Sequence, residues 1–142
     1  MIVDCPPNLG VTTVNAFATC RIVVITIECK FEALEAVLQL MHTLKRVTKG
    51  RAGIIPYALP TFLERTNVSR DVLKQIQDQF RHLCLPPIHK NTRIPEAFKA
   101  RAPIGSYDQT STGALDYMTT ARELLNHLEA MPSGGTQSTA AI

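Results

Sequence analysis

The sequence predicts an α/β fold built on a partial, doubly wound and mostly parallel sheet. Two observations support this prediction. Runs of β-branched residues alternate along the chain with helical apolar patterns, and residues 21–27 are apolar at almost every position. Strands that helices cover on both faces of a parallel sheet have such continuous apolar runs. The length of 142 residues fits one domain.

The chain opens with a short apolar segment that is predicted to be a strand ending at Asp4. Ile2 and Val3 are β-branched and suit a buried strand, whereas Pro6 and Pro7 cannot continue one. Asp4 is therefore expected at the carboxyl end of a strand, where open α/β sheets bind ligands. A plainer interpretation is an aspartate that caps the following helix.

The remaining elements are predicted in alternation. Helices are expected at residues 11–19, 31–48, 69–81 and 111–129, with a brief helix at 96–100, and strands at residues 21–27, 52–58 and 83–88. Ser69 is the expected N-cap of the third long helix. The last helix has an apolar face of Leu115, Met118, Leu125 and Leu128. Residues 1–130 are expected to form the domain, and residues 131–142 a disordered tail. One sheet edge, along the strand of Asp4, should be open unless another chain covers it.

Composition narrows the class of protein. Apolar residues make up 45% and charged residues 19% of the chain, so a folded protein is expected. The four cysteines show no C-x-x-C spacing, which favours buried free thiols in a reducing cytoplasm over a zinc site. No apolar run approaches the ~18 residues that a spanning helix needs. We therefore expect a cytoplasmic protein with no membrane contact.

The segment from residue 81 to residue 101 is basic. It holds five cations, Arg81, Lys90, Arg93, Lys99 and Arg101, against the single acid Glu96. Basic groups that face phosphates would bind DNA without sequence preference and with a steep salt dependence. No recognition helix or aromatic platform argues for the reading of bases. A solvated charged loop is the alternative interpretation.

Several stretches of the sequence resemble one family in order and in spacing. They are residues 3–10 (VDCPPNLG), 14–17 (VNAF), 28–35 (ECKFEALE), 65–69 (RTNVS), 91–97 (NTRIPEA) and 107–114 (YDQTSTGA). Together they resemble the C-terminal half of a ParA/Soj-type partition ATPase, a relative of the MinD-like P-loop ATPases. The chain departs from the family at Arg21, where an acidic residue is usual, and at residues 26–28.

The resemblance implies roles for particular residues. Asp4 would hold the Mg²⁺ ion that bridges the β- and γ-phosphates of ATP. The segment that responds to the nucleotide would contain Pro6, Pro7, Asn8 and Gly10. The loops that hold the nucleotide base would contain Pro56, Tyr57, Pro87 and Asn91, for which ordinary turn chemistry is the alternative. Contacts to DNA would come from Arg65, Lys90, Arg93, Lys99 and Arg101.

One motif of the family is missing from the sequence. No G-x-x-x-x-G-K-[ST] segment occurs in the 142 residues, so this chain has no P-loop to cradle phosphates. The intact family would use ATP and Mg²⁺, whereas this chain alone is expected to bind neither and to hydrolyse nothing. We also expect it to be a marginally stable monomer, because half of the sheet is missing.

The resemblance also implies partners. They are non-specific DNA of the nucleoid, a ParB-type centromere-binding protein, and a second subunit, either a copy of this chain or a chain that bears a P-loop. The alternative is a non-enzymatic decoy that pairs with full-length ParA-like proteins or binds DNA weakly. The sequence leaves open whether the chain is a gene fragment or a genuine short protein.

Overall fold

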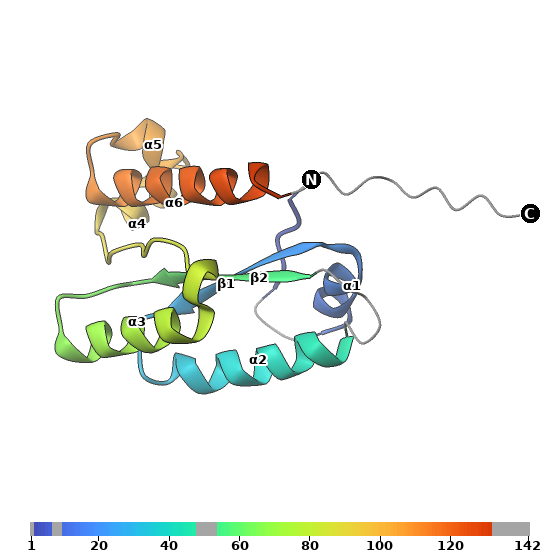
Figure 1. Ribbon diagram of the computed structural model, residues 1–142. Coiled ribbons are helices and arrows are strands. Elements are labelled where there is room, and N and C mark those ends of the chain that lie inside the picture. The colour runs from blue at the N-terminus through green and yellow to red at the C-terminus, as the bar shows by residue number, and fades with distance from the viewer. Residues whose placement is uncertain (1, 7–9, 48–53, 132–142) are drawn as a thin grey trace, which may run out of the picture.

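A small parallel sheet lies between two layers of helices in the computed structural model, which describes residues 2–6, 10–47 and 54–131 (Figure 1). The sheet contains β1 (Ile22–Glu28) and β2 (Ile55–Thr61). Helices α2 (Ala33–Val47) and α3 (Asn67–Phe80) lie on one side of it, and α6 (Thr112–Glu129) lies on the other. The predicted α/β fold with a partial parallel sheet is confirmed.

The two strands pair in parallel over their whole length, from Ile22 opposite Ile55 to Glu28 opposite Thr61. The predicted fourth strand, residues 83–88, runs beside the far edge of β2. It makes isolated parallel bridges, Ala58 with Cys84 and Leu63 with His89, rather than a continuous ladder. Pro86 and Pro87 explain the interruption, because neither has an N–H to donate.

The helices follow the predicted order with shifted ends. Besides α2, α3 and α6, the described residues form α1 (Val11–Thr19), the 3₁₀ turn η1 (Arg81–Leu83), α4 (Arg93–Lys99) and α5 (Ile104–Tyr107). The bounds of α1 coincide with the prediction. Sequence analysis missed α5, a single turn of helix that follows Pro103. The predicted tail falls outside the described residues from residue 132 onward, as do residues 52 and 53 of the strand predicted at 52–58.

The core lies between the sheet and the layer of α2 and α3. Its buried members are Ile25, Ile27, Cys29, Val37, Ala58, Leu63, Val72, Ile76 and Phe80. Successive side chains of a strand point to opposite faces. Ile25 and Ile27 therefore bury one face of β1, and Val24 belongs to the other face. That second face is open: Val24 is 40% exposed, contrary to the expected burial on both sides.

The predicted opening strand is not formed. Residues 2–6 have no regular structure, and the side chain of Ile2 is 99% exposed. A strand needs a neighbour for its backbone N–H and C=O groups. No described strand lies against this segment, so the apolar character of Ile2 and Val3 cannot impose a strand by itself.

The expected cap of α3 is corrected, and the shared apolar face of α6 is exposed. Thr66, not Ser69, is the N-cap of α3, and its Oγ1 accepts a hydrogen bond from the Ser69 N–H at 3.2 Å. Ser69 is buried in the first turn, where its Oγ accepts from the Glu64 N–H at 3.0 Å. In α6 the apolar residues Leu115, Met118 and Leu125 are exposed, whereas the buried residues are Gly113, Ala114 and Thr120.

Candidate functional site

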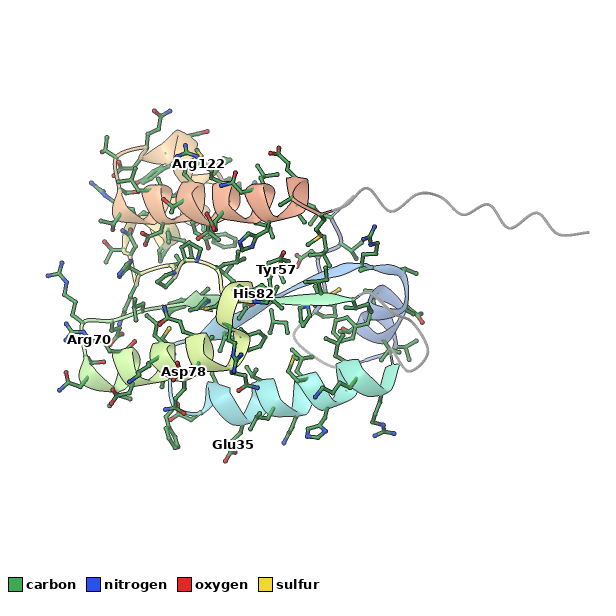
Figure 2. All side chains as sticks on the ribbon, viewed as in Figure 1. Glu35, Tyr57, Arg70, Asp78, His82 and Arg122 are labelled. Atoms are coloured by element: carbon green, nitrogen blue, oxygen red, sulfur yellow. The ribbon has the colours of Figure 1, made fainter. Side chains whose placement is uncertain are left out.

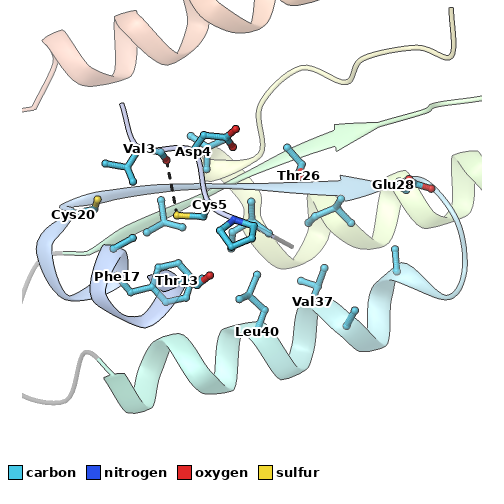
Figure 3. A pocket seen from close by; sticks show the side chains of 18 of the residues that line it. Val3, Asp4, Cys5, Thr13, Phe17, Cys20, Thr26, Glu28, Val37 and Leu40 are labelled. Carbon is cyan, nitrogen blue, oxygen red and sulfur yellow. Dashed lines mark hydrogen bonds between the residues drawn. The ribbon is translucent and has the colours of Figure 1, made fainter. Parts of the chain in front are cut away.

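A groove of about 670 Å³ follows the free edge of β1 (Figure 3). We call it the edge groove. The irregular segment from Val3 to Pro6 lies on one side, and the apolar side chains of Phe17 in α1 and of Val37 and Leu40 in α2 lie on the other. The groove thus runs between the N-terminal segment and the helices, with the backbone of β1 along its length.

Asp4 lines the edge groove, and its side chain is exposed. Among the described residues, no three side chains of His, Cys, Asp or Glu come together in a way that could hold a metal ion. Mg²⁺ needs about six oxygen ligands in octahedral geometry and is usually held by one or two carboxylates together with substrate phosphates. Asp4 therefore fits one position of such a shell and cannot complete it with its own neighbours.

The segment predicted to respond to the nucleotide is described only at its two ends. Pro6 lines the edge groove beside Asp4. Gly10 is the N-cap of α1, with an extended backbone and no side chain to accept a bond from the first turn. Pro7 and Asn8 lie outside the described residues. The helix α1 therefore begins seven residues after Asp4, at Val11, without a side-chain cap.

The first predicted pair of base-binding residues lies inside a strand. Pro56 and Tyr57 belong to β2, not to a loop that follows it. Tyr57 is 2% exposed and lies between the sheet and α6 (Figure 2). Its ring stacks on His127 of α6 with a centroid distance of 5.5 Å. This stack joins the sheet to α6. A role in binding a nucleotide base stays a prediction for both residues.

The second predicted pair lies in the segment that faces α6, with Asn91 beside the start of that helix. Pro87 is half-buried in the segment that runs along β2. The Asn91 amide is bound at both ends, because its Nδ2 donates to Thr112 Oγ1 at 2.6 Å and its Oδ1 accepts from the Arg93 N–H at 2.7 Å. A Cβ at Gly113 would come within 3.0 Å of Ile94, so the helix approaches this turn closely.

Lys90, one of the predicted DNA-binding residues, is paired with a carboxylate. Its Nζ donates to Glu64 Oε1 at 2.6 Å. The hydrogen bond from Lys90 and the charge of Lys90 hold the pKa of the Glu64 carboxyl below its usual range. Because the two groups are exposed, water screens the pair, and its main consequence is to neutralise one cation of the basic segment.

Arg93 is also neutralised. Its Nη1 donates to Glu96 Oε2 at 2.8 Å, and its Nε lies 3.3 Å from Asp108 Oδ2. The hydrogen bond to Glu96 and the two carboxylate charges raise the pKa of the Arg93 guanidinium. Two carboxylates therefore compensate the charge of this one arginine.

The other three predicted DNA-binding cations are Arg65, Lys99 and Arg101. All three are exposed, and none forms an ion pair with another described residue. A helix C-terminal motif fixes the position of Arg101, whose φ is 54°. The Arg101 N–H donates to Phe98 O and the Ala102 N–H to Ala97 O, both at 3.0 Å. The backbone at the end of α4 is thus closed by its own hydrogen bonds beside the two cations.

Sequence reasoning missed the acids that organise this region. Glu64, Asp108 and Asp116 come from three different parts of the chain, and Asp116 Oδ2 accepts from both the His89 N–H at 2.9 Å and His89 Nδ1 at 3.0 Å. Only the excess of cations over acids within residues 81–101 was visible in the sequence. Glu64, Asp108 and Asp116 lie outside that window and reach it through the fold.

Among the described residues, no helix is both long enough and apolar enough to cross a membrane. This finding concerns helical spans alone. It agrees with the absence of a long apolar run in the sequence, where charged residues interrupt each apolar stretch.

Comparison with known proteins identifies relatives of this chain. A family described as "AAA domain" matches residues 1–54. The Sporulation initiation inhibitor protein Soj of Bacillus subtilis is 37% identical over 128 residues, which cover 87% of this chain and 51% of Soj. The Chromosome partitioning protein ParA of Myxococcus xanthus is 34% identical over 132 residues, 88% of this chain and 46% of that protein. The Chromosome partitioning protein ParA of Caulobacter vibrioides is 33% identical over 130 residues, which cover 89% of this chain and 49% of that protein.

The chain thus spans about half the length of the curated relatives that it matches. The similarity is not confined to one motif, because it extends over most of the 142 residues. The fold agrees with it, since a parallel sheet between helices is what a piece of a P-loop domain contains. The chain belongs to the ParA/Soj-type P-loop ATPase family.

Proposed function

We propose that this chain supplies the magnesium-binding carboxylate and the DNA-contacting surface of a ParA-type partition ATPase. The observation that carries the proposal is the similarity to proteins named for chromosome partitioning over 88% of the chain. In an intact assembly ATP and Mg²⁺ would be the cofactors. A ParB-type protein, nucleoid DNA in the cytoplasm and a second subunit would be the partners.

Asp4 would be the magnesium ligand, with ATP phosphates completing the shell. Its place on the edge groove supports this role, because the exposed carboxylate has open space beside it. Without a G-x-x-x-x-G-K-[ST] segment the chain has no backbone cradle for those phosphates. Hydrolysis therefore requires a polypeptide that brings the P-loop, and this chain by itself hydrolyses no ATP.

DNA contact would depend on Arg65, Lys99 and Arg101 more than on the other two predicted cations. Lys90 and Arg93 already have carboxylate partners, and a phosphate would have to displace these. Contacts of cations to phosphates position a protein on DNA without reading its sequence. The binding we propose is accordingly weak, sequence-independent and sensitive to salt.

The experiment combines this chain with a polypeptide that holds the half of Bacillus subtilis Soj that it does not match. Phosphate release from ATP with Mg²⁺ is measured for each chain alone and for the mixture. We expect release only from the mixture, and its loss when the chain carries Asp4→Asn. Asp71→Asn removes another exposed carboxylate, on α3, and should leave the rate unchanged. Equal rates for the Asp4 and Asp71 variants would refute the role of Asp4.

A decoy is the second candidate, and the missing P-loop motif favours it. Such a protein would pair with an intact ParA-type subunit and leave it without a second catalytic site. Adding this chain in excess to full-length Soj should then lower the rate of ATP hydrolysis per Soj subunit. An unchanged rate, with no association of the two proteins in analytical ultracentrifugation, would eliminate the decoy.

A further inference from the structure

We propose that the C-terminal end of α4 binds an unpaired base of single-stranded DNA. Phe98 is the surface on which the base stacks, and Lys99 and Arg101 contact the flanking phosphates. The inference rests on the proposed function for the choice of DNA, and it deepens that function by adding a form of DNA that the cations alone do not select. The argument for the site comes from one exposed ring, the two cations beside it and the backbone that holds them.

The ring of Phe98 is free on the surface. Its side chain is 86% exposed, the largest value among the five phenylalanines and three tyrosines of the chain. The aromatic contacts in the described residues are the Tyr57–His127 stack and the Lys30 cation above Phe62, and neither involves Phe98. Sequence analysis found no aromatic platform, because a phenylalanine in the sequence resembles a core residue until its exposure is known. A single exposed apolar residue is common, so the neighbours of Phe98 must identify the site.

Two cations share a concavity with this ring. An open hollow of about 570 Å³, which we call the α4 hollow, is lined by Phe98, Lys99, Arg101 and Ala102. No acid lines it in the described part of the chain, and neither cation forms an ion pair with another described residue. The acid closest in sequence, Glu96, is held by Arg93 at 2.8 Å. The α4 hollow therefore joins an apolar ring to uncompensated positive charge, which complements a base and its phosphates.

The backbone at the end of α4 determines how these side chains lie. The Arg101 N–H donates to Phe98 O and the Ala102 N–H donates to Ala97 O, both at 3.0 Å. These two bonds are the pair that closes a helix in the Schellman motif. Ala97 is 2% exposed and anchors the turn in the fold. Because the motif reverses the chain at the helix end, Arg101 lines the same hollow as Phe98.

Arg101 occupies a backbone position that glycine usually fills. Its φ is 54°, in the left-handed region that side chains with a Cβ rarely adopt. An arginine there costs stability that glycine would not, which points to a use for the side chain outside the fold. A guanidinium pairs with phosphate and also stacks on planar rings. A nucleic acid strand offers both groups within one nucleotide.

Single-stranded DNA fits the α4 hollow better than a duplex or a membrane does. The bases of a duplex are stacked on one another and offer only their edges, whereas an unpaired base offers its face to an aromatic ring. A membrane-binding helix needs an apolar face of several residues. In α4, which has seven residues, Ala97 is buried and Ile94 packs at Gly113. Phe98 is the one large apolar side chain that α4 exposes.

Fluorescence anisotropy with two labelled DNAs tests the proposal on the full 142-residue chain. One is a short oligothymidine, and the other is a duplex of arbitrary sequence. We expect Phe98→Ala to weaken binding of oligothymidine about tenfold and to leave binding of the duplex unchanged. Phe31→Ala is the matched control, because it removes a phenylalanine that is 68% exposed before α2 and should change neither affinity. Equal affinities of the two variants for oligothymidine would overturn the proposal.

The salt dependence separates stacking from charge. Stacking releases no counterions, so Phe98→Ala should lower the binding constant for oligothymidine by the same factor at every salt concentration. Lys99→Gln should instead reduce the slope of the logarithmic plot by about 0.7, the value for one phosphate contact of a single strand. A changed slope in Phe98→Ala, or an unchanged slope in Lys99→Gln, would contradict the roles assigned to these residues.

Replacement of the ring separates stacking from plain apolar contact. Phe98→Trp should keep the affinity for oligothymidine, and because the chain has no other tryptophan, quenching of the indole fluorescence reports the stack. Phe98→Leu should lose affinity as Phe98→Ala does. Full affinity in Phe98→Leu would overturn the proposal, as would binding to vesicles of anionic phospholipid that depends on Phe98. Tighter binding of an oligouridine of equal length would overturn the choice of DNA.

This test fails independently of the proposed function. Stacking on Phe98 requires neither ATP nor Asp4. If the duplex binds and the affinity for oligothymidine does not depend on Phe98, the DNA-contacting surface stands and the base site falls. If Phe98 supports binding of oligothymidine and the mixture with the Soj half hydrolyses no ATP, the base site stands and the catalytic proposal falls.

Discussion

The ion pairs around the basic segment lead to a quantitative prediction for DNA binding. Of the five cations predicted from the sequence, Lys90 and Arg93 are held by carboxylates, and three are left to face phosphates, Arg65, Lys99 and Arg101. The logarithm of the binding constant falls with the logarithm of salt concentration by about 0.9 per phosphate contact. Three contacts give a slope of about −2.7, and five give about −4.5.

These slopes are well separated over an accessible range. Between 50 and 200 mM salt, three contacts predict a loss of affinity of about 40-fold, and five predict about 500-fold. Fluorescence anisotropy with a labelled duplex of arbitrary sequence measures both. The triple variant Arg65→Gln, Lys99→Gln, Arg101→Gly should show almost no salt dependence. Glycine is used at residue 101 because its φ of 54° suits glycine.

The control is a double variant that removes a neutral pair. Glu64→Gln with Lys90→Gln leaves the net charge unchanged and should leave the slope at about −2.7. A slope near −4.5 for the unmodified chain would refute the assignment, as would an unchanged slope in the triple variant. The first result would mean that phosphates displace the carboxylates from both Lys90 and Arg93, and the second that Arg65, Lys99 and Arg101 do not contact the DNA.

Three further predictions concern stability and reactivity. Ser111→Ala removes the hydroxyl that accepts from the Ala114 N–H at 3.2 Å, and it should lower the free energy of unfolding in urea by about 1 kcal/mol. Ile76→Ala leaves a cavity in the core and should cost about 2–5 kcal/mol in the same assay, whereas a cost below 1 kcal/mol would contradict the packing. Burial and the nearby Cys84 raise the pKa of the Cys29 thiol to about 11. At pH 8 alkylation of Cys29 should therefore be at least tenfold slower than that of the more exposed Cys5, and it should accelerate as the pH rises towards 11, as mass spectrometry of timed samples would reveal.

Elements that depend on local pattern were predictable from the sequence, and elements that depend on a neighbour were not. Helix α1 and the long stripe of α2 follow from apolar spacing, which is a local property. The strand expected at Ile2 and Val3 failed because its hydrogen-bonding neighbour is absent from the described residues. Thr66 competed with Ser69 for the same cap, and only the backbone angles decide between them.

The same distinction between local and non-local features applies to the residues of the candidate site. Asp4 could be singled out because a carboxylate between an apolar run and two prolines is a local signal. The pairing of Lys90 with Glu64, 26 residues apart, could not, since the sequence gives no measure of which acid reaches which cation. The exposure of Leu115 and Met118 was also unpredictable, because a helical stripe shows which side chains share a face and not what covers it.

The contacts of α6 determine how this helix can detach. Thr120 Oγ1 donates to Pro86 O at 3.0 Å, Asp116 accepts from His89, and His127 stacks on Tyr57. All three partners belong to β2 or to the segment after η1 that runs beside it, and none lies in α2 or α3. Sub-global opening could therefore release α6 as a unit while the opposite helical layer stays folded. Opening of that kind would bring Tyr57, 2% exposed in the closed state, into contact with solvent, so its fluorescence would report the motion directly.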